Sequence, residues 1–285
     1  MIQVRPVHPL VGAEVSGVDL TRPLDDETFA AIREAFARYS VLVFHDQPVD
    51  DEQQMAFSRR FGPLEITKVG SRGAGTNLAY ITNLDENGKR VPLGHKAILT
   101  LKANSLWHTD SSFKKVPALA SVLTGRIVPP EGGETEFLST RAVWCELPED
   151  IKRRIDGMVA WHSYFNSRRQ IDPEMMTAEE HQAVPPVKQV LVRVHPETGE
   201  KALYIASHAS HIDGLPEAEG RKLLADLMEF ATDRRFVYTH RWKQHDLVIW
   251  DNRCTMHRGR PFDYERHDRY MIRTTIAGDG PTVEQ

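Results

Sequence analysis

Three short motifs in the chain place a histidine two positions before a carboxylate, a spacing that can serve metal binding. They are His108-Thr-Asp110, His195-Pro-Glu197 and His211-Ile-Asp213. Residues i and i+2 of a β-strand point to the same face, so an imidazole and a carboxylate at this spacing can share one metal ion. A chain with 13 histidines and 40 acidic residues is expected to contain about two such matches by chance. The motif alone therefore does not identify a site.

The residues around each motif separate the three. His108 follows the stretch NSLW, which has no proline or glycine and so permits a strand end, and we take His108 and Asp110 as candidate ligands. A proline follows His195 in HPETGEK, which is typical of a hairpin turn, and His211 stands just before a glycine and a proline at a helix start. We therefore expect His195 and His211 to be solvated turn or helix-cap histidines.

A third ligand candidate, His257, lies just beyond the apolar run LVIW and the polar turn DNRCTM. Two histidines and one carboxylate on one face leave the opposite coordination positions empty, and Fe(II) needs these positions for a chelating cosubstrate and O2. Zinc is the competing metal, and a hydrolase that uses zinc-bound water is the competing enzyme class. Structural zinc favours closed thiolate sites, and neither Cys145 nor Cys254 is placed to contribute to one.

Two arginines, Arg269 and Arg273, follow His257 at intervals of 12 and 16 residues. The guanidinium group suits two-pronged binding of a carboxylate. If a strand runs through residues 269–276, the two side chains share a face. Paired arginines are more often surface charges, but beside an iron triad they become candidates for binding an anionic cosubstrate and an anionic substrate.

Composition limits the function classes. The formal net charge of -4 and the isoelectric point near 6.4 show no basic excess, so nucleic acid is not an expected partner. No apolar run approaches the roughly 20 residues that cross a bilayer, so no membrane association is expected. Two cysteines provide no disulfide framework. We therefore expect a cytoplasmic protein with one catalytic domain over residues 1–285.

Hydrophobic periodicity predicts a few helices among many short strands. Helices are expected from Asp25 or Asp26 through residue 39, over 50–61, over roughly 140–157 and from Pro216 onward. Short β-type runs are IQVRPV, AEVSGVDL, SVLVF, ALASVLTGRIV, ETEFLS, QVLVRVH, ALYIAS, FVYTHRW, DLVIWD and MIRTTIAG. The expected fold class is mainly β, with a sandwich core and flanking helices.

The segment 66–106 differs from the rest of the chain. It is irregular and rich in glycine, asparagine and charge, and Glu86-Asn87-Gly88 resembles a hairpin turn. We interpret it as a flexible cover over the active site.

Several segments together resemble the taurine dioxygenase / 2,4-dichlorophenoxyacetate dioxygenase family of Fe(II), 2-oxoglutarate-dependent oxygenases. They are GVDL, SVLVFHDQ, AFSRRFGPLE, NSLWHTDSSF, PPEGGETEF, WDNRCTMHRGRPFD and RYMIRTTI, and they extend over essentially the whole chain. The segments NSRRQ, AVPPV and ASHASHIDGLPEAEGRKLL are most similar to the phenoxyacetate branch. The resemblance implies a double-stranded β-helix, or jelly-roll, whose two sheets bring distant segments to one mouth.

The resemblance also implies how the cofactors are bound. It places Fe(II) at His108, Asp110 and His257. It pairs the distal carboxylate of 2-oxoglutarate with Arg269, assisted by the hydroxyl of Thr135, which lies 27 residues after His108 in GGETEF. The interval from His257 to Arg269 is one residue longer than the usual family spacing, so the turn at 263–266 is expected to absorb an insertion.

The same resemblance implies a set of residues around the primary substrate. Arg273 would face its anionic end. Asn104 and Phe113 match positions that line the substrate cavity, and Lys68 in ITKVG resembles a cavity lysine of the phenoxyacetate branch.

The implied reaction consumes 2-oxoglutarate and O2, releases succinate and CO2, and hydroxylates a small anionic organic substrate. An aryloxyalkanoate such as 2,4-dichlorophenoxyacetate, with ether cleavage, is the first expectation, and herbicide degradation would be the corresponding role. Taurine, another alkylsulfonate or an alkyl sulfate is the alternative substrate. A jelly-roll that binds an anion without catalysis is a further alternative. Family members are commonly oligomeric, so a homo-oligomer is expected.

Overall fold

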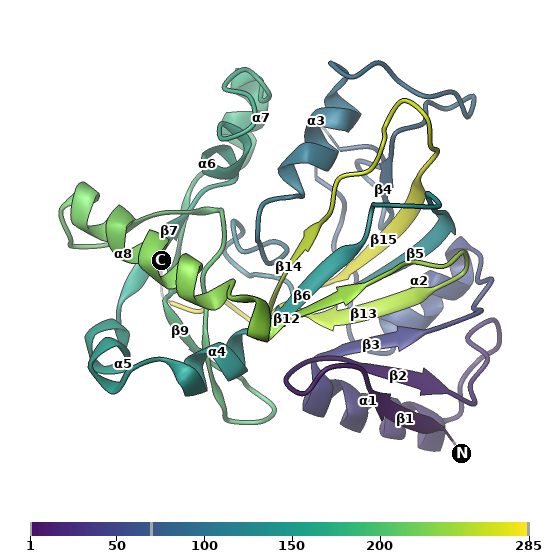
Figure 1. Cartoon of the computed structure of the whole chain (residues 1–285), viewed down its shortest axis with the longest axis horizontal. Coiled ribbons are helices and arrows are strands. Elements are labelled where there is room, and N and C mark those ends of the chain that lie inside the picture. The colour runs from purple at the N-terminus through teal and green to yellow at the C-terminus, as the bar shows by residue number, and fades with distance from the viewer. Residues whose placement is uncertain (1, 69–70, 284–285) are drawn as a thin grey trace.

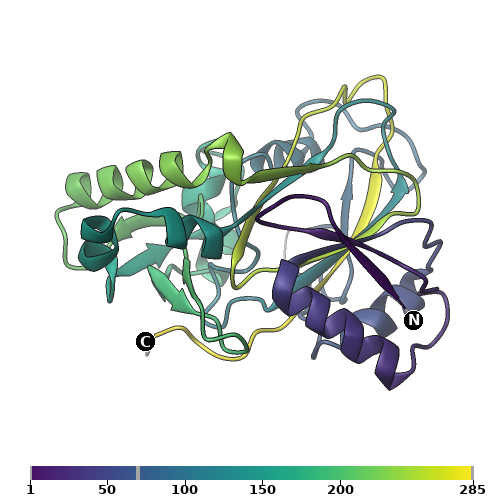
Figure 2. The same ribbon diagram turned by 60° about the horizontal axis from the view of Figure 1, so that its bottom comes forward.

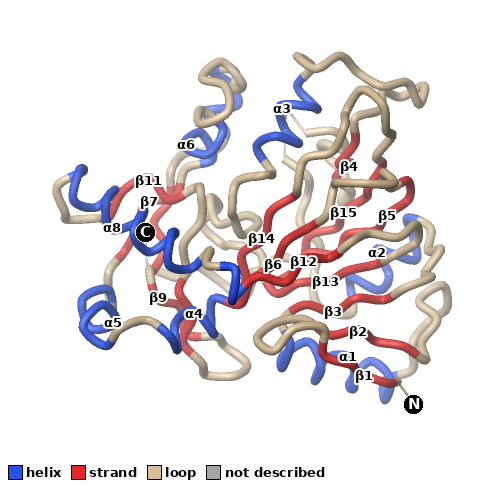
Figure 3. The backbone as a smooth tube through the Cα atoms, in the orientation of Figure 1, coloured by secondary structure: helices blue, strands red, loops and turns tan. Residues whose placement is uncertain are grey.

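The computed structural model describes residues 2–68 and 71–283 and is mainly β with flanking helices. Strands lie at the centre of the molecule and most helices lie toward its periphery, as Figures 1 and 3 show. This agrees with the fold class expected from the sequence. None of the described helices is long and apolar enough to span a membrane.

The largest sheet has seven strands and joins the N-terminal part of the chain to segments far along the sequence. In spatial order its strands are β1 (Gln3–Pro6), β2 (Ala13–Ser16), β3 (Val41–Phe44), β13 (Leu247–Asp251), β5 (Ala120–Ile127), β15 (Tyr270–Ile276) and β4 (Ala79–Thr82). All neighbours are antiparallel except β2 and β3. The central strands therefore bring residues of the first half of the chain beside residues of the last quarter.

A second sheet, ordered β12 (Val237–His240), β6 (Thr135–Ser139) and β14 (Thr255–Gly259), packs against the large sheet. Phe137 of β6 and Trp250 of β13 meet with ring centroids 5.5 Å apart, inside an apolar cluster that also takes Val41 and Val43 from β3. Because side chains alternate along a strand, the intervening Leu42 and Phe44 belong to a different cluster on the other face. Burial on both faces explains why SVLVF reads as a continuous apolar run.

Helices α1 (Asp26–Tyr39) and α2 (Asp51–Arg59) cover that other face, as Figure 2 shows for α1. The side chain of Asp25 caps α1 by accepting from the Thr28 N–H, and Asp50 forms a capping box with Gln53 at the start of α2. These caps were readable in the sequence, and both predicted helices are confirmed.

The remaining elements form a smaller group beside the two sheets. It contains a three-stranded sheet, β11 (Ala209–Ile212), β7 (Val159–His162) and β8 (Val187–Val190), and a hairpin of β9 (Val192–Val194) and β10 (Lys201–Leu203). Its helices are α4 (Thr140–Glu146), α5 (Glu149–Ile155), α6 (Tyr164–Arg168), α7 (Ala178–Ala183) and α8 (Glu217–Ala231). A single turn of 3₁₀ helix, Arg234–Phe236, leads from α8 into β12.

Two expectations need correction. The helix expected over roughly 140–157 is two helices, α4 and α5, separated at Leu147 and Pro148, because proline at the start of a helix lacks the N–H that would continue the preceding one. The segment 66–106 is less irregular than expected, since it contains β4 and helix α3 (Lys96–Ala103). The turn expected at 86–88 is present, with Asp85 and Lys89 joined by a backbone hydrogen bond.

Candidate active site

The two candidate histidine ligands lie on neighbouring stretches of backbone. His108 pairs with His257 of β14 through two reciprocal bonds: the His108 N–H donates to the His257 carbonyl at 3.0 Å, and the His257 N–H donates back at 2.8 Å. A further bond from the Gly259 N–H to the Asn104 carbonyl extends this pairing. The imidazole rings consequently lie with their centroids 4.2 Å apart. Strand pairing thus explains how residues so distant in sequence meet.

The carboxylate of Asp110 completes the cluster. One ligand atom from each of His108, Asp110 and His257 can be chosen so that all lie within 4.8 Å of one another, and Nε2 of His257 lies 3.8 Å from Oδ2 of Asp110. All three residues are buried, with 5–7% of their surface exposed. The predicted pair of histidines and one carboxylate therefore converge on one point.

The histidines are prepared to act as ligands. The Nδ1–H of His108 donates to the Leu106 carbonyl at 2.7 Å, because a carbonyl can only accept, and Nε2 is left with its lone pair toward the cluster. Burial lowers the pKa of both His108 and His257, so the rings are neutral at physiological pH. A metal ion requires neutral imidazoles.

The carboxylate of Asp110 is held in one orientation and kept ionised. Arg273 donates to Oδ1 at 2.6 Å and the hydroxyl of Ser121 donates to Oδ2 at 2.7 Å. Burial alone would raise the pKa of Asp110, but Arg273, His257, His108 and the Ser121 hydrogen bond hold it well below its ordinary value.

Asn252, in the turn between β13 and β14, closes a ring of hydrogen bonds around this carboxylate. Its amide donates to Oγ of Ser121 at 3.0 Å, and its Oδ1 accepts from the Asp110 N–H at 3.1 Å. Since Ser121 accepts from Asn252, its one proton is committed to Asp110. The ring therefore fixes both the direction of the serine hydroxyl and the tilt of the carboxylate.

Behind His257 lies a small second cavity of about 40 Å³ that contains a buried arginine. Arg269 is 6% exposed, and within the described part of the chain its guanidinium makes no hydrogen bond or ion pair. Burial lowers its pKa to about 10. Thr135 lines the same cavity, and its Oγ accepts from Nε1 of Trp242 at 2.9 Å, which leaves its own proton free to donate. The two residues fit a carboxylate that enters beside His257.

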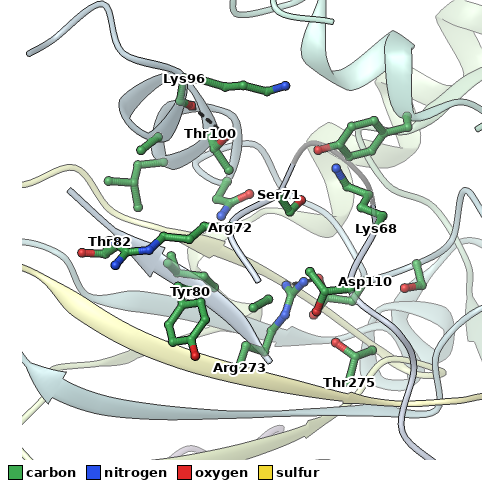
Figure 4. Close-up of a pocket in the computed structure, with 18 of the residues that line it drawn as sticks. Lys68, Ser71, Arg72, Tyr80, Thr82, Lys96, Thr100, Asp110, Arg273 and Thr275 are labelled. Carbon is green, nitrogen blue, oxygen red and sulfur yellow. Dashed lines mark hydrogen bonds and ion pairs between the residues drawn. The ribbon is translucent and has the colours of Figure 1, made fainter. Parts of the chain in front are cut away.

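A larger cavity of about 390 Å³ lies beside the ligand cluster (Figure 4). His108 and Asp110 form part of its wall, and β4 and α3 supply apolar side chains such as Ile81 and Leu101. The four residues predicted to surround the primary substrate all lie in the wall of this cavity: Lys68, Asn104, Phe113 and Arg273. Arg269 and Arg273 also border the second cavity together, which agrees with the shared face expected from their spacing.

Three further cavity residues were not singled out from the sequence: Tyr164, Arg168 and His208. Arg168 belongs to NSRRQ, where an Arg-Arg pair is indistinguishable from surface charge. His208 lies in ASHASH, one of several histidines without a motif. No local pattern separates these residues from solvent-exposed ones, because their burial depends on packing between β7, α6 and β11.

The expectation for the two other histidine motifs was wrong in its structural detail. His195 is not solvated: it is 1% exposed, and its Nε2 lies 3.0 Å from Oδ2 of Asp251. His211 is on strand β11 rather than at a helix cap, and its ring stacks on Trp161. Neither residue approaches the cluster at Asp110.

A second buried cluster surrounds His195. Asp251 and Cys254 lie near it, so the three could be taken for metal ligands. However, Arg253 donates from Nε to Oδ1 of Asp251 at 2.9 Å and from Nη2 to Oδ2 at 2.7 Å, and Nδ1 of His195 accepts from two backbone N–H groups. Arg253 holds both oxygens of Asp251 and both ring nitrogens of His195 have partners, so this cluster offers no free imidazole nitrogen and is structural.

Two neutral imidazoles, one ionised carboxylate and a buried unpaired arginine beside them are the features of an Fe(II), 2-oxoglutarate-dependent dioxygenase. The residues fit the metal because the Nδ1–H of His108 is used by the Leu106 carbonyl, which leaves Nε2 as the ligand atom. Each oxygen of Asp110 accepts one hydrogen bond, from Arg273 or from Ser121, and keeps a further lone pair for the ion. A family model described as "Taurine catabolism dioxygenase TauD, TfdA family" matches residues 3–275. The chain belongs to this family.

Individual relatives agree with this assignment. The alpha-ketoglutarate-dependent 2,4-dichlorophenoxyacetate dioxygenase of Cupriavidus pinatubonensis is 42% identical over 280 residues, which cover 96% of this chain and 98% of that protein. An (S)-phenoxypropionate/alpha-ketoglutarate-dioxygenase of Sphingobium herbicidovorans is 37% identical, covering 97% and 95%. The crystal structure of AAD-2 in complex with Mn(II) and N-oxalylglycine is 44% identical, covers all of both chains and superposes with a TM-score of 0.93. Dependence on 2-oxoglutarate, another name for alpha-ketoglutarate, is thus supported by sequence, structure and site.

Proposed function

We propose that this enzyme hydroxylates an aryloxyalkanoate, such as 2,4-dichlorophenoxyacetate, at the carbon next to the ether oxygen. The observation that carries the proposal is a cavity of about 390 Å³ that joins an apolar wall to cationic side chains beside the ligand cluster. An aromatic ring and a carboxylate require these two surfaces. The relatives named for 2,4-dichlorophenoxyacetate and (S)-phenoxypropionate support the same substrate class.

In this proposal His108, Asp110 and His257 hold Fe(II), and Arg269 and Thr135 bind the distal carboxylate of 2-oxoglutarate. Bound iron and 2-oxoglutarate supply the activation of O2, with release of succinate and CO2. The protein contributes ligand geometry, orientation of both organic molecules and a cavity that excludes water. The hydroxylated product is a hemiacetal, which breaks its C–O bond to give a phenol and an oxo acid.

The fold supports a more detailed description of the scaffold. We infer that the seven-stranded sheet and the β12-β6-β14 sheet form a jelly-roll within a single catalytic domain, in keeping with the structural neighbours. The segment 66–106 would act as the cover of the site. Its helix α3 contributes Lys96, which lies in the cavity wall and whose ammonium group pairs with Glu180 of α7.

A substrate panel tests the proposal. The enzyme, loaded anaerobically with Fe(II) and 2-oxoglutarate, is exposed to O2 with 2,4-dichlorophenoxyacetate, (S)-2-phenoxypropionate, hexyl sulfate or taurine. We expect the two phenoxy acids to release succinate well above the uncoupled background, together with an equal amount of phenol. Succinate release driven only by hexyl sulfate or taurine would replace the proposed substrate class by the corresponding sulfur-containing one.

A further inference from the structure

The hydroxyl of Thr135 lies where three strands meet. Thr135 is the first residue of β6, and it pairs with His240 of β12 on one side and with Gly259 of β14 on the other (Figure 3). It is 3% exposed, and it lines the second cavity together with Arg269. Strand pairing on both sides fixes the backbone of Thr135, so the direction of its hydroxyl depends on side-chain contacts.

One such contact comes from Trp242. Its Nε1 lies 2.9 Å from Oγ of Thr135. An indole nitrogen can only donate, so the hydroxyl must accept this bond. A threonine hydroxyl has a single proton, and no described group of the protein accepts it. The proton is therefore left for an acceptor that enters the second cavity.

Trp242 reaches Thr135 from the loop between β12 and β13. It stands two residues beyond His240, the strand partner of Thr135, and its ring packs edge to face with the His240 imidazole, with centroids 4.6 Å apart and an angle of 84° between the planes. Gly125 of β5 lies against the same ring, since a β-carbon at that position would be 3.4 Å from Cε3 of Trp242. Packing thus gives the indole a defined place.

The loop that carries Trp242 is tied to the large sheet by main-chain bonds. The His245 N–H donates to the Gly125 carbonyl at 2.8 Å, and the Gly125 N–H donates to the Asp246 carbonyl at 3.0 Å. The carboxylate of Asp246 is fully buried and accepts from the Lys243 N–H at 2.8 Å. Trp242 therefore stands on a fixed support, which a residue needs if it is to orient another side chain.

Trp242 can act on the second cavity only through Thr135. The described residues that line this cavity include Thr135 and Arg269 but not Trp242. A carboxylate only accepts hydrogen bonds, so it requires a donor from Thr135 and is repelled by the lone pairs of the hydroxyl. A hydroxyl that accepts one hydrogen bond also donates a stronger one, because each bond polarises the next. The indole therefore sets the direction of the hydroxyl and strengthens it as a donor.

We propose that Trp242 is a positioning residue for 2-oxoglutarate, because its indole N–H directs the hydroxyl of Thr135 at the distal carboxylate. The proposal rests on the proposed function in taking Arg269 and Thr135 as the subsite for that carboxylate. The effect is selective, since a 2-oxo acid without a distal carboxylate gains nothing from it. Trp242 thereby contributes to the choice among 2-oxo acids although it does not touch them.

Anaerobic binding tests this without turnover. Protein loaded with Fe(II) is titrated with 2-oxoglutarate or with 2-oxovalerate, in which a methyl group replaces the distal carboxylate, and the visible absorption of the iron-chelated 2-oxo acid reports binding. Trp242→Phe keeps an aromatic ring but loses the N–H, so the Kd of 2-oxoglutarate should rise about 5- to 10-fold. The Kd of 2-oxovalerate should change less than about twofold.

The two acids and a second tryptophan provide the controls. Trp161→Phe removes another indole N–H, which donates to the exposed Asp213 at 2.9 Å, and should bind both acids like wild type. Both acids are titrated into the same preparation, so a general disturbance of the fold would affect their Kd values alike. An equal loss of affinity for the two acids in Trp242→Phe would make Trp242 a packing residue and overturn the proposal.

A double variant traces the effect to Thr135. Thr135→Val removes a hydrogen bond to a charged group, so the Kd of 2-oxoglutarate should rise on the order of 30-fold. Adding Trp242→Phe to Thr135→Val should change this Kd less than about twofold, because the indole acts through the hydroxyl. Losses that add in the double variant would contradict the proposal, as would an unchanged Kd in Trp242→Phe alone.

These outcomes are distinct from a failure of the proposed function. If neither Thr135→Val nor Arg269→Gln alters the Kd of 2-oxoglutarate, the distal carboxylate binds elsewhere, and the subsite and the role of Trp242 are both contradicted. If both variants weaken binding and Trp242→Phe does not, only the role of Trp242 fails. The proposed aryloxyalkanoate is not involved, because the titration contains no primary substrate.

Discussion

Two of the buried places in the described chain where histidine meets aspartate, around Asp251 and around Asp110, differ in how completely the protein satisfies the imidazole nitrogens. Around Asp251, Arg253 and His195 occupy both carboxylate oxygens, and Arg253 also reaches Glu197 and Asp279. Around Asp110, Arg273 and Ser121 also bond both carboxylate oxygens, but Nδ1 of His257 is buried without a hydrogen-bond partner among the described residues. We call the cluster around Asp251 the closed cluster, because its polar atoms have partners within the protein, and the cluster around Asp110 the open cluster, because it can still bind a ligand.

The same contrast holds for buried arginines. Arg253 is 1% exposed and contacts three carboxylates, whereas Arg269 and Arg168 are 6% and 8% exposed and contact none among the described residues. Residue type and burial are therefore poor guides to function in this protein. A better guide is a buried polar group that faces a cavity and has no hydrogen-bond partner. The free-energy cost of burying such a group is recovered only when a ligand binds it.

The largest expected effect follows from disabling the open cluster. Asp110→Asn replaces the one anionic ligand by an amide, so we expect loss of tight Fe(II) binding and a fall in turnover of about 1,000-fold or more, equivalent to about 4 kcal/mol. Metal content and succinate release measure it. Asp213→Asn, at the exposed position directly after β11 in another His-x-Asp motif, is the control and should bind iron normally. Undiminished turnover in Asp110→Asn would remove the basis for calling this cluster the metal site.

Breaking the closed cluster should affect folding instead. Asp251→Asn leaves Arg253 buried beside a neutral group, which costs about 3–5 kcal/mol of stability and lowers Tm by roughly 10 °C. Burial would raise the pKa of Asp251, but Arg253 and His195 hold it below the ordinary value of about 3.9. The stabilisation is therefore present above that pH and declines as the pH falls below it. Thermal melts at pH 7 and pH 3 should show a smaller difference between wild type and variant at the lower pH.

A matched variant distinguishes this effect from general loss of charge. Asp279 contacts Arg253 at 3.1 Å, but its side chain is 45% exposed, so Asp279→Asn should cost less than about 1 kcal/mol. A Tm change for Asp251→Asn as small as that for Asp279→Asn would show that the closed cluster contributes little to stability.

Arg269 provides the corresponding test among the arginines. Arg269→Gln removes the buried cation that faces the second cavity, and we expect the KM for 2-oxoglutarate to rise about 100-fold with a much smaller change for the primary substrate. Steady-state kinetics with each substrate varied in turn give the two values. Arg266→Gln, on the same loop with its side chain 82% exposed, is the control. The reverse pattern, in which only the KM for the primary substrate rises, would show that Arg269 binds the primary substrate and not 2-oxoglutarate.

The ring of hydrogen bonds around Asp110 should contribute less than the ligand itself. In Ser121→Ala the carboxylate loses its donor and regains freedom to rotate, so metal affinity should fall about 10- to 100-fold. Ser58→Ala removes another buried serine, which bonds Thr274 at 2.6 Å away from the site, and should leave metal affinity unchanged. Anaerobic Co(II) titration measures both variants, and equal affinities would show that Ser121 does not position the carboxylate.

Much of the site was predictable because its information is local. The spacing of His108 and Asp110, the turn before His257 and the pair of arginines each stand in a short segment, and the family resemblance links these segments. The same holds for α1 and α2, whose capping residues Asp25 and Asp50 are adjacent to their apolar stripes. Short-range signals of this kind can be recognised in the sequence without knowledge of the tertiary structure.

The features that the sequence did not predict depend on contacts between distant segments. His195 looks like a turn residue because its partner Asp251 lies 56 positions away. Arg168 looks like surface charge until α6 packs against the cavity, and α3 is hidden in a segment rich in turn residues. The break between α4 and α5 does not depend on distant contacts. Pro148 is a local signal for it, but the helical periodicity of the residues on both sides led us to expect one continuous helix.

The reciprocal backbone bonds between His108 and His257 have a consequence for how the ion is acquired. Main-chain pairing, and not the ion, determines the spacing of the two imidazoles, so little conformational entropy remains to be lost when coordination begins. The protein ligands are therefore held in position before the metal ion binds. Chelation should accordingly extinguish activity while the β-sheet signal in circular dichroism persists, and readdition of iron should restore turnover without a refolding delay.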